Sequence, residues 1–176
     1  MSSRVRIGVI GLGEAGSLIA AGLQAAGADV IGFDPVVPET PPVPLAPDVA
    51  AVVTGADIVI SINSSTAAKK VAEQVAPLLG AGTVYADLNT GTPALKKALA
   101  GLFGDGMFAD VAIMKPVPGL AEKVPMGVAG PGARRFVDLL EQYGMNLEYV
   151  SDVPGEAAAR KLLVDGIDKF QHGQLA

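Results

Sequence analysis

The chain has 176 residues, of which half are hydrophobic and 18% are charged, so we expect a buried core and exclude wholesale disorder. The absence of cysteine excludes disulfides, thiolate metal sites and cysteine nucleophiles. A net charge of -5 argues against a nucleic-acid-binding protein, which needs a basic face.

Short β-branched runs alternate with stretches rich in alanine and leucine, a pattern typical of βαβ units and a parallel sheet. In chain order we predict a strand over residues 5–10, a helix over 14–26, a strand over 30–33, a short helix over 48–54, a strand over 58–62, a helix over 65–79, a strand over 83–88, a helix over 93–102, strands over 107–114 and 124–129, a helix over 133–143, a strand over 147–150 and a helix over 156–170. Six prolines between residues 35 and 47 predict a stiff, extended loop. The fold class is therefore α/β, a doubly wound and mostly parallel sheet of the Rossmann type. We expect its first six strands to be ordered as in dinucleotide-binding domains, with an extension at one edge.

The first residues imitate a secretory signal only superficially. Arg4 and Arg6 precede an apolar run, but glycines interrupt that run, Glu14 follows it, and there is no clean small-residue cleavage site. No stretch of about 18 uncharged apolar residues could span a bilayer. We expect a cytoplasmic protein without membrane contact.

A glycine-rich turn joins the first predicted strand to the first predicted helix. Gly11 permits the tight turn, Gly13 lets a pyrophosphate approach the backbone, and Gly16 lets helix and strand pack closely. Amide groups at the helix N-terminus would then meet the phosphates. We predict that this turn binds a dinucleotide through Gly11, Leu12, Gly13, Glu14 and Gly16. The alternative is a glycine-rich turn in an ordinary α/β protein.

Asp34 ends the second predicted strand and can accept hydrogen bonds from the hydroxyls of the adenosine ribose. A carboxylate there repels a 2′-phosphate, and no Arg or Lys follows in the proline-rich loop to offset it. This favours NAD(H), while NADP(H) stays possible because Arg4, Arg6 or a distant lysine could fold nearby. The alternative role of Asp34 is a cap on the strand end.

Further landmarks follow in a fixed order. They are Ile62-Asn63-Ser64-Ser65, Asp87-Leu88-Asn89-Thr90, Phe108-Ala109-Asp110-Val111, Val124-Pro125-Met126 before Gly130-Pro131, and Gly155-x5-Lys161. With the turn, these segments resemble the N-terminal domain of the β-hydroxyacid dehydrogenase superfamily, which includes 6-phosphogluconate and 3-hydroxyisobutyrate dehydrogenases. The segment from Met114 to Pro118 is most similar to a bacterial subgroup that is 6-phosphogluconate dehydrogenase-like.

The resemblance implies hydride transfer between a nicotinamide and a hydroxyl-bearing carbon of a small acid. In the family, a lysine at the position of Lys161 passes the proton to or from the substrate oxygen, which requires a lysine that can titrate. Asn63, Ser64 and Thr90 would line the nicotinamide side, with Ile62 in the same cofactor loop. Without the family, Lys161 would be read as a solvated charge and the others as loop caps.

The sequence also departs from the family. Related dehydrogenases carry a Ser-Gly-Gly turn that holds the substrate carboxylate, and this chain has Met114-Lys115-Pro116 there. Asp165 stands four residues after Lys161, where relatives have asparagine or serine. His172 is the single histidine and is read as part of the tail, so we predict neither a metal site nor a Ser/His/Asp set.

We predict a dinucleotide-binding domain over residues 1–152 and a C-terminal helix over 153–176 that would lead into a helical domain. Leu162, Leu163, Ile167 and Phe170 give that helix an apolar face, which favours a homodimer or a missing helical domain.

The leading hypothesis is the cofactor-binding part of an NAD(P)-dependent oxidoreductase that acts on a small hydroxy acid or a related carbonyl. Whether this chain catalyses the reaction by itself stays open. The second hypothesis is a nicotinamide-nucleotide-binding module without catalysis. A third, a nucleotide-sugar or coenzyme-A binder, is disfavoured by Asp34 and by the spacing of Lys161.

Overall fold

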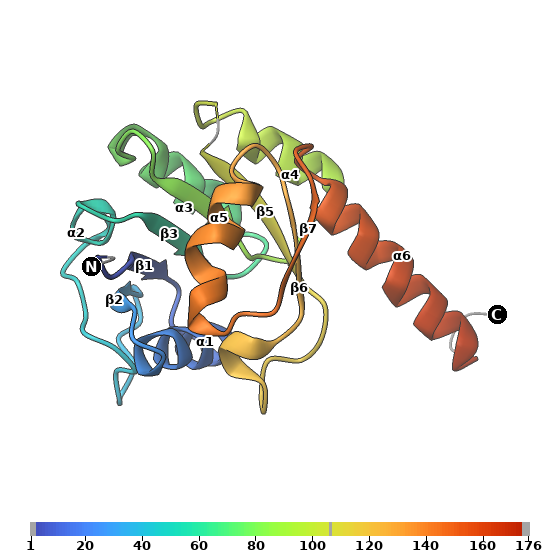
Figure 1. Cartoon of the computed structure of the whole chain (residues 1–176), viewed down its shortest axis with the longest axis horizontal. Coiled ribbons are helices and arrows are strands. Elements are labelled where there is room, and N and C mark those ends of the chain that lie inside the picture. The colour runs from blue at the N-terminus through green and yellow to red at the C-terminus, as the bar shows by residue number, and fades with distance from the viewer. Residues whose placement is uncertain (1–2, 106, 174–176) are drawn as a thin grey trace.

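A computed structural model describes residues 3–105 and 107–173 and contains a seven-stranded sheet (Figure 1). The strand order across the sheet is β2-β1-β3-β4-β5-β6-β7. The strands are β1 (Arg6–Ile10), β2 (Asp29–Phe33), β3 (Ile58–Ser61), β4 (Val84–Asp87), β5 (Phe108–Ile113), β6 (Met126–Ala129) and β7 (Leu147–Ser151). The first five are parallel, β6 runs antiparallel to β5, and β7 is parallel to β6. The predicted mostly parallel sheet is confirmed.

Helices cover both faces of the sheet (Figure 1). They are α1 (Glu14–Ala25), α2 (Val49–Val53), α3 (Ala68–Val75), α4 (Pro93–Ala100), α5 (Ala133–Leu140) and α6 (Glu156–Gln171), with short 3-10 turns at Ala76–Leu78, Ala121–Lys123 and Glu141–Tyr143. Apolar residues of α1 and α5 pack on one face, and those of α2, α3 and α4 pack on the other. The neighbours Ile58 and Val59 on β3 accordingly point into different cores. The chain is therefore doubly wound.

The proline-rich loop pairs with the edge of the sheet at one position. Leu45 forms a single parallel bridge with Gly32 on β2. The amide of Gly32 donates to the Pro44 carbonyl at 2.9 Å, and the amide of Ala46 donates to the Gly32 carbonyl at 2.8 Å. A third strand in the usual dinucleotide-binding order would lie here, and it is reduced to this bridge because prolines cannot donate to a ladder.

The predicted helix over residues 65–79 is shorter in the structure. The hydroxyl of Ser64 accepts a hydrogen bond from the amide of Ala67 at 3.3 Å, so the chain is still turning where the helix was expected. Pro77 then lies in the 3-10 turn that ends α3.

The last helix leaves the body of the domain (Figure 1). Only Ala157 and Ala158, in its first turn, are buried, whereas Phe170 near its other end is 74% exposed. No helix among residues 3–105 and 107–173 is long and apolar enough to cross a membrane.

Phe136 on α5 is fully buried in the core beneath α1 and α5, so Phe136→Ala should lower the free energy of unfolding by about 3–5 kcal/mol. The exposed Asp138 on the same helix is the control, and Asp138→Ala should stay within about 0.5 kcal/mol of the parent. Chemical denaturation measures both, and equal losses would contradict the packing described.

Candidate functional site

The turn between β1 and α1 leaves no room for a side chain at either of two positions, Gly11 and Gly16. Gly11 has φ of 107°, and a Cβ added there would lie 2.0 Å from the carbonyl oxygen of Ile62. A Cβ on Gly16 would lie 2.0 Å from the carbonyl oxygen of Gly11. Both glycines are therefore required by close backbone approach, as the sequence predicts.

Gly13 differs from its neighbours because a Cβ there would meet nothing within 4 Å. It is the N-cap of α1, and no side chain caps the helix. The first amide groups of α1 thus face an open groove, which is the arrangement that binds phosphate.

Asp34 ties the end of β2 to this turn. Its Oδ2 accepts the amide of Leu12 at 2.7 Å, and its Oδ1 accepts the amide of Val36 at 2.9 Å. Leu12 itself is buried and does not line the groove. The strand-end cap considered for Asp34 is present, and Asp34 also lines the groove.

A groove of about 420 Å³ brings most of the predicted cofactor residues together. Its lining residues are Gly11, Gly13, Glu14, Ala15, Gly16, Asp34, Ile62, Asn63, Ser64 and Ala67. Of the predicted cofactor residues, only Leu12 and Thr90 do not line it.

A larger cavity of about 690 Å³ adjoins the groove at Asn63 and Ala67. Its walls are mainly apolar and come from Ile10, Phe33, Pro35, Asp48, Val49, Ala50, Asn63, Ala67, Lys70, Val71, Gln74 and Leu78. The sequence analysis missed this cavity, because these residues come from β1, β2, α2 and α3 and share no pattern along the chain.

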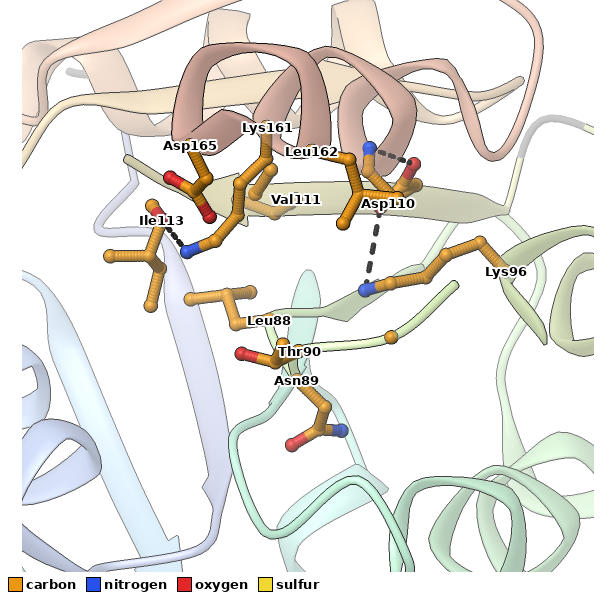
Figure 2. Close-up of a pocket in the computed structure, with 13 residues that line it drawn as sticks. Leu88, Asn89, Thr90, Lys96, Asp110, Val111, Ile113, Lys161, Leu162 and Asp165 are labelled. Carbon is orange, nitrogen blue, oxygen red and sulfur yellow. Dashed lines mark hydrogen bonds and ion pairs between the residues drawn. The ribbon is translucent and has the colours of Figure 1, made fainter. Parts of the chain in front are cut away.

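A separate, smaller cavity of about 90 Å³ has Lys161 in its wall (Figure 2). We call it the Lys161 cavity. Its lining residues are Leu88, Asn89, Thr90, Gly91, Lys96, Asp110, Val111, Ala112, Ile113, Ala158, Lys161, Leu162 and Asp165. Lys161 is partly buried, and its Nζ donates to the carbonyl of Ile113 at 2.5 Å. Thr90 and Asp165 therefore lie with Lys161 rather than with the glycine-rich turn.

The spacing from Gly155 to Lys161 has a physical cause. Gly155 has φ of 96°, and a Cβ there would lie 2.8 Å from the carbonyl oxygen of Pro93 at the start of α4. Ala157 and Ala158 then let the first turn of α6 pack against the sheet. This close packing delivers Lys161 to the carboxyl end of β5.

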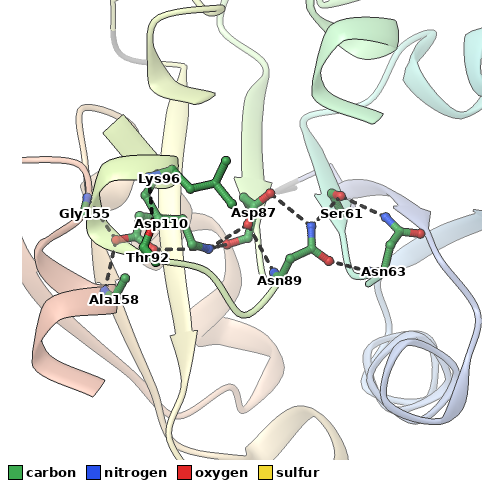
Figure 3. Close-up of polar contacts among 10 residues, drawn as sticks. Ser61, Asn63, Asp87, Asn89, Thr92, Lys96, Asp110, Gly155 and Ala158 are labelled. Carbon is green, nitrogen blue, oxygen red and sulfur yellow. Dashed lines mark hydrogen bonds and ion pairs between the residues drawn. The ribbon is translucent and has the colours of Figure 1, made fainter. Parts of the chain in front are cut away.

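A hydrogen-bond network links the groove beside the glycine-rich turn to the Lys161 cavity (Figure 3). The Asn89 amide group donates to Ser61 Oγ at 3.1 Å and to Asp87 Oδ2 at 3.0 Å, while its Oδ1 accepts from the backbone amide of Asn63. Asn63 Nδ2 also donates to Ser61 Oγ at 3.0 Å. Burial raises the pKa of the Tyr85 phenol beside this network, so that phenol stays protonated.

Lys96 is a buried charged residue of this region that the sequence analysis missed. Its Nζ lies 2.6 Å from Asp87 Oδ1 and 3.4 Å from Asp110 Oδ1, and the lysine is only 2% exposed. A signal existed in the sequence, because Lys96 stands three residues before Leu99 and so shares the buried face of the predicted helix.

Two other residues considered in the sequence lie apart. Lys115 is exposed and does not line the Lys161 cavity. His172 is exposed at the end of α6, where its Nδ1 lies 2.7 Å from the Asp168 carbonyl oxygen.

The strand order, the uncapped α1 and the groove beside the glycine turn define a dinucleotide-binding domain. Residues 6–111 match the family described as the NAD binding domain of 6-phosphogluconate dehydrogenase. The chain belongs to this family and is an NAD(P)-binding domain of the hydroxyacid dehydrogenases, so the resemblance seen in the sequence is confirmed.

Solved structures agree with this assignment. A conserved hypothetical protein from Sinorhizobium meliloti 1021 is 35% identical, with a TM-score of 0.85 over 93% of this chain and 59% of that one. A conserved protein described as structurally similar to 3-hydroxyacid dehydrogenases is 27% identical, with a TM-score of 0.84 over 94% of this chain and 65% of that one. The 3-hydroxyisobutyrate dehydrogenase of Mycobacterium tuberculosis, solved with L-serine, shares the fold at 19% identity and a TM-score of 0.81, over 94% and 60% of the two chains.

The chain thus spans less than two thirds of the length of these relatives. No curated protein is significantly similar to it in sequence.

Gly13 and Gly16 should respond differently to a side chain. Gly13→Val should lower the unfolding free energy by no more than about 1 kcal/mol, the cost of a poorer N-cap residue, and weaken NADH binding by about tenfold or more, because valine would fill the groove. Gly16→Ala should instead destabilise the fold by about 1–3 kcal/mol, because its Cβ meets backbone. Chemical denaturation and NADH fluorescence titration separate the two effects, and tight NADH binding by Gly13→Val would contradict the location of the groove.

Proposed function

We propose that this chain is the cofactor-binding part of an oxidoreductase that interconverts a hydroxyl group of a small hydroxy acid and the corresponding carbonyl. The observation that carries the proposal is that Lys161 lies in a small cavity linked by hydrogen bonds to the cofactor groove. A bound nicotinamide would supply or accept the hydride. The chain itself would bind the dinucleotide at the glycine turn and handle the proton.

Lys161 is the proposed acid–base residue. Its amine already makes one hydrogen bond, to the Ile113 carbonyl, which fixes its direction within the cavity. Thr90 and Asn89 line the same cavity and offer hydrogen-bonding groups for a substrate oxygen. The apolar wall formed by Val111 and Ile113 would limit water around the reacting carbon.

The proposed roles of individual residues in cofactor binding are based on their positions in the groove beside the glycine-rich turn. Gly11, Gly13, Glu14 and Gly16 would surround the pyrophosphate, with Leu12 contributing backbone, and Asp34 would accept hydrogen bonds from the ribose. Ile62, Asn63 and Ser64 form the opposite wall. The adjoining apolar cavity has the size and position to hold the adenine ring.

NAD(H) is the proposed preference, because the Asp34 carboxylate would face the 2′ position. Lys70 works against it, since this exposed cation lines the adjoining cavity and could attract a 2′-phosphate. Asp34 is fixed by two hydrogen bonds whereas Lys70 forms no ion pair among the described residues, so we give Asp34 the greater weight.

A helical domain or a second copy of the chain is the proposed cover for α6. The exposed residues Leu162, Leu163, Ile167 and Phe170 form an apolar surface on this projecting helix. Residues 1–152 would then be the cofactor domain, and α6 (Glu156–Gln171) would be the helix between two structural units.

A nicotinamide-nucleotide-binding module without catalysis is the second candidate. Asp165 favours it, because a carboxylate in the Lys161 cavity would repel the carboxylate of a hydroxy acid. The two candidates separate when NADH binding and hydroxy-acid oxidation are measured on the same purified protein. Binding without turnover would support the module, and failure to bind either nicotinamide dinucleotide would overturn both.

Lys161→Ala should reduce turnover of an active hydroxy acid by about 10²–10⁴-fold while the Kd for NADH changes by less than about twofold. The exposed Lys169 on the same helix is the matched control, and Lys169→Ala should keep full turnover. Steady-state kinetics and fluorescence titration provide both values. Unchanged turnover in Lys161→Ala would remove Lys161 from the reaction.

Asp34→Ser should lower the ratio of NADH affinity to NADPH affinity by about threefold or more, because it removes the charge that repels a 2′-phosphate. Both affinities should also fall, since the carboxylate holds the Leu12 amide of the turn. The exposed Asp29, at the far end of the same strand, gives the control Asp29→Ser. An unchanged ratio in Asp34→Ser would exclude Asp34 as the source of the preference.

A further inference from the structure

Three buried charged residues lie at the Lys161 cavity, which two of them, Lys96 and Asp110, help to line, and they take no part in the reaction proposed above (Figures 2 and 3). Asp87 and Asp110 are 0% exposed, and Lys96 between them is 2% exposed. Lys96 Nζ donates to Asp87 Oδ1 at 2.6 Å and to the Asp87 carbonyl at 3.0 Å. Buried charges are expensive unless they are paired, so a cluster with two carboxylates and one ammonium needs further compensation.

The start of α6 supplies that compensation. Asp110 Oδ2 accepts the amides of Gly155 at 3.0 Å and Ala158 at 3.2 Å. Gly155 is the N-cap of α6 and has no side chain to cap it. Asp110 therefore caps α6 from β5, and its negative charge lies at the positive end of the helix dipole.

The other oxygen of Asp110 depends on Lys96. Oδ1 has no hydrogen-bond partner, and the Lys96 ammonium at 3.4 Å is its ion-pair partner. Without Lys96 this buried carboxylate would face Asp87 with no cation between them. The carboxylate that caps α6 is thus held in place by a residue on α4.

The same strand also positions the amine of Lys161. Ile113, whose carbonyl accepts from Lys161 Nζ, stands three residues after Asp110 on β5. Lys161 stands three residues after Ala158 on α6, about one helical turn away. Asp110 therefore anchors the buried first turn of α6, and the exposed ion pair between Arg160 and Glu148 adds a second attachment beside Lys161.

We propose that Lys96 is a positioning residue: acting through Asp110, it fixes the start of α6 and thereby the place of the Lys161 amine in its cavity. The importance of that place for turnover rests on the proposed function, whereas the attachment of α6 does not.

The first test is amide hydrogen exchange by NMR in the full chain with Lys96→Met. Exchange at Gly155, Ala157 and Ala158 should become at least about tenfold faster than in the parent, beyond any change in β1 or α1. Leu99→Ala controls for general weakening of α4, since Leu99 packs in the apolar core that α4 shares with α2 and α3, away from Asp110. Lys97→Met controls for loss of a lysine, since Lys97 is exposed.

The second test is the rate of acetylation of Lys161 by acetic anhydride, measured by peptide mass spectrometry against the exposed Lys169. The ratio should rise at least about threefold in Lys96→Met and stay at the parent value in both controls. Asp110→Ala should give the same rise. It leaves Lys96 paired with Asp87, so the buried charges balance and this variant is expected to fold even where Lys96→Met does not.

The double variant Lys96→Met/Asp110→Ala decides whether Lys96 acts through Asp110. The α6 exchange rates and the Lys161 acetylation ratio should match those of Asp110→Ala alone. Additive effects, or parent-like values in either single variant, would overturn the proposal. These readouts require no turnover, so they fail separately from the kinetics of Lys161→Ala that test the proposed function. Where turnover is measured, Lys96→Met should lower kcat and leave the Kd for NADH within about twofold.

Discussion

The structure depends on a steric constraint at the turn after β1, where backbone meets backbone without intervening side chains. The carbonyl oxygen of Ile62 occupies the space a Cβ on Gly11 would need, and the carbonyl oxygen of Gly11 does the same for Gly16. Because β1 pairs with both β2 and β3, this contact brings the ends of three strands together. Asp34 and Asn63, which follow two of those strands, therefore border one groove.

The sequence predicts this part of the molecule well because each constraint restricts the residue type at the position where it acts. A position where any side chain would clash requires glycine. A strand that is buried on both faces requires apolar residues along its length. The strands were placed to within a few residues, and the groove contains the predicted residues of the turn and of the 62–64 loop. The roles of these residues in binding stay predictions.

The features that the sequence does not predict depend on contacts between segments that are distant along the chain. Lys96 is buried because Asp87 and Asp110 arrive from two strands. Its spacing from Leu99 places it on the buried face of α4, but that spacing does not indicate which charges it meets. Thr90 was predicted to line the nicotinamide side, and the structure places it in the Lys161 cavity because α6 packs on β5, next to the segment that follows β4. The apolar cavity beside the groove likewise draws on four separate elements. No spacing rule along the chain encodes such meetings.

The single bridge between Leu45 and Gly32 also affects how the protein behaves in a crowded solution. The outer edge of β2 would otherwise present unpaired amides and carbonyls to any extended chain nearby. Segment 35–47 covers that edge with a backbone that has few amides to offer, because six of its residues are proline. A second chain therefore finds no continuous ladder on this side. Covering an edge strand in this way is one of the devices by which proteins limit aggregation through strand addition.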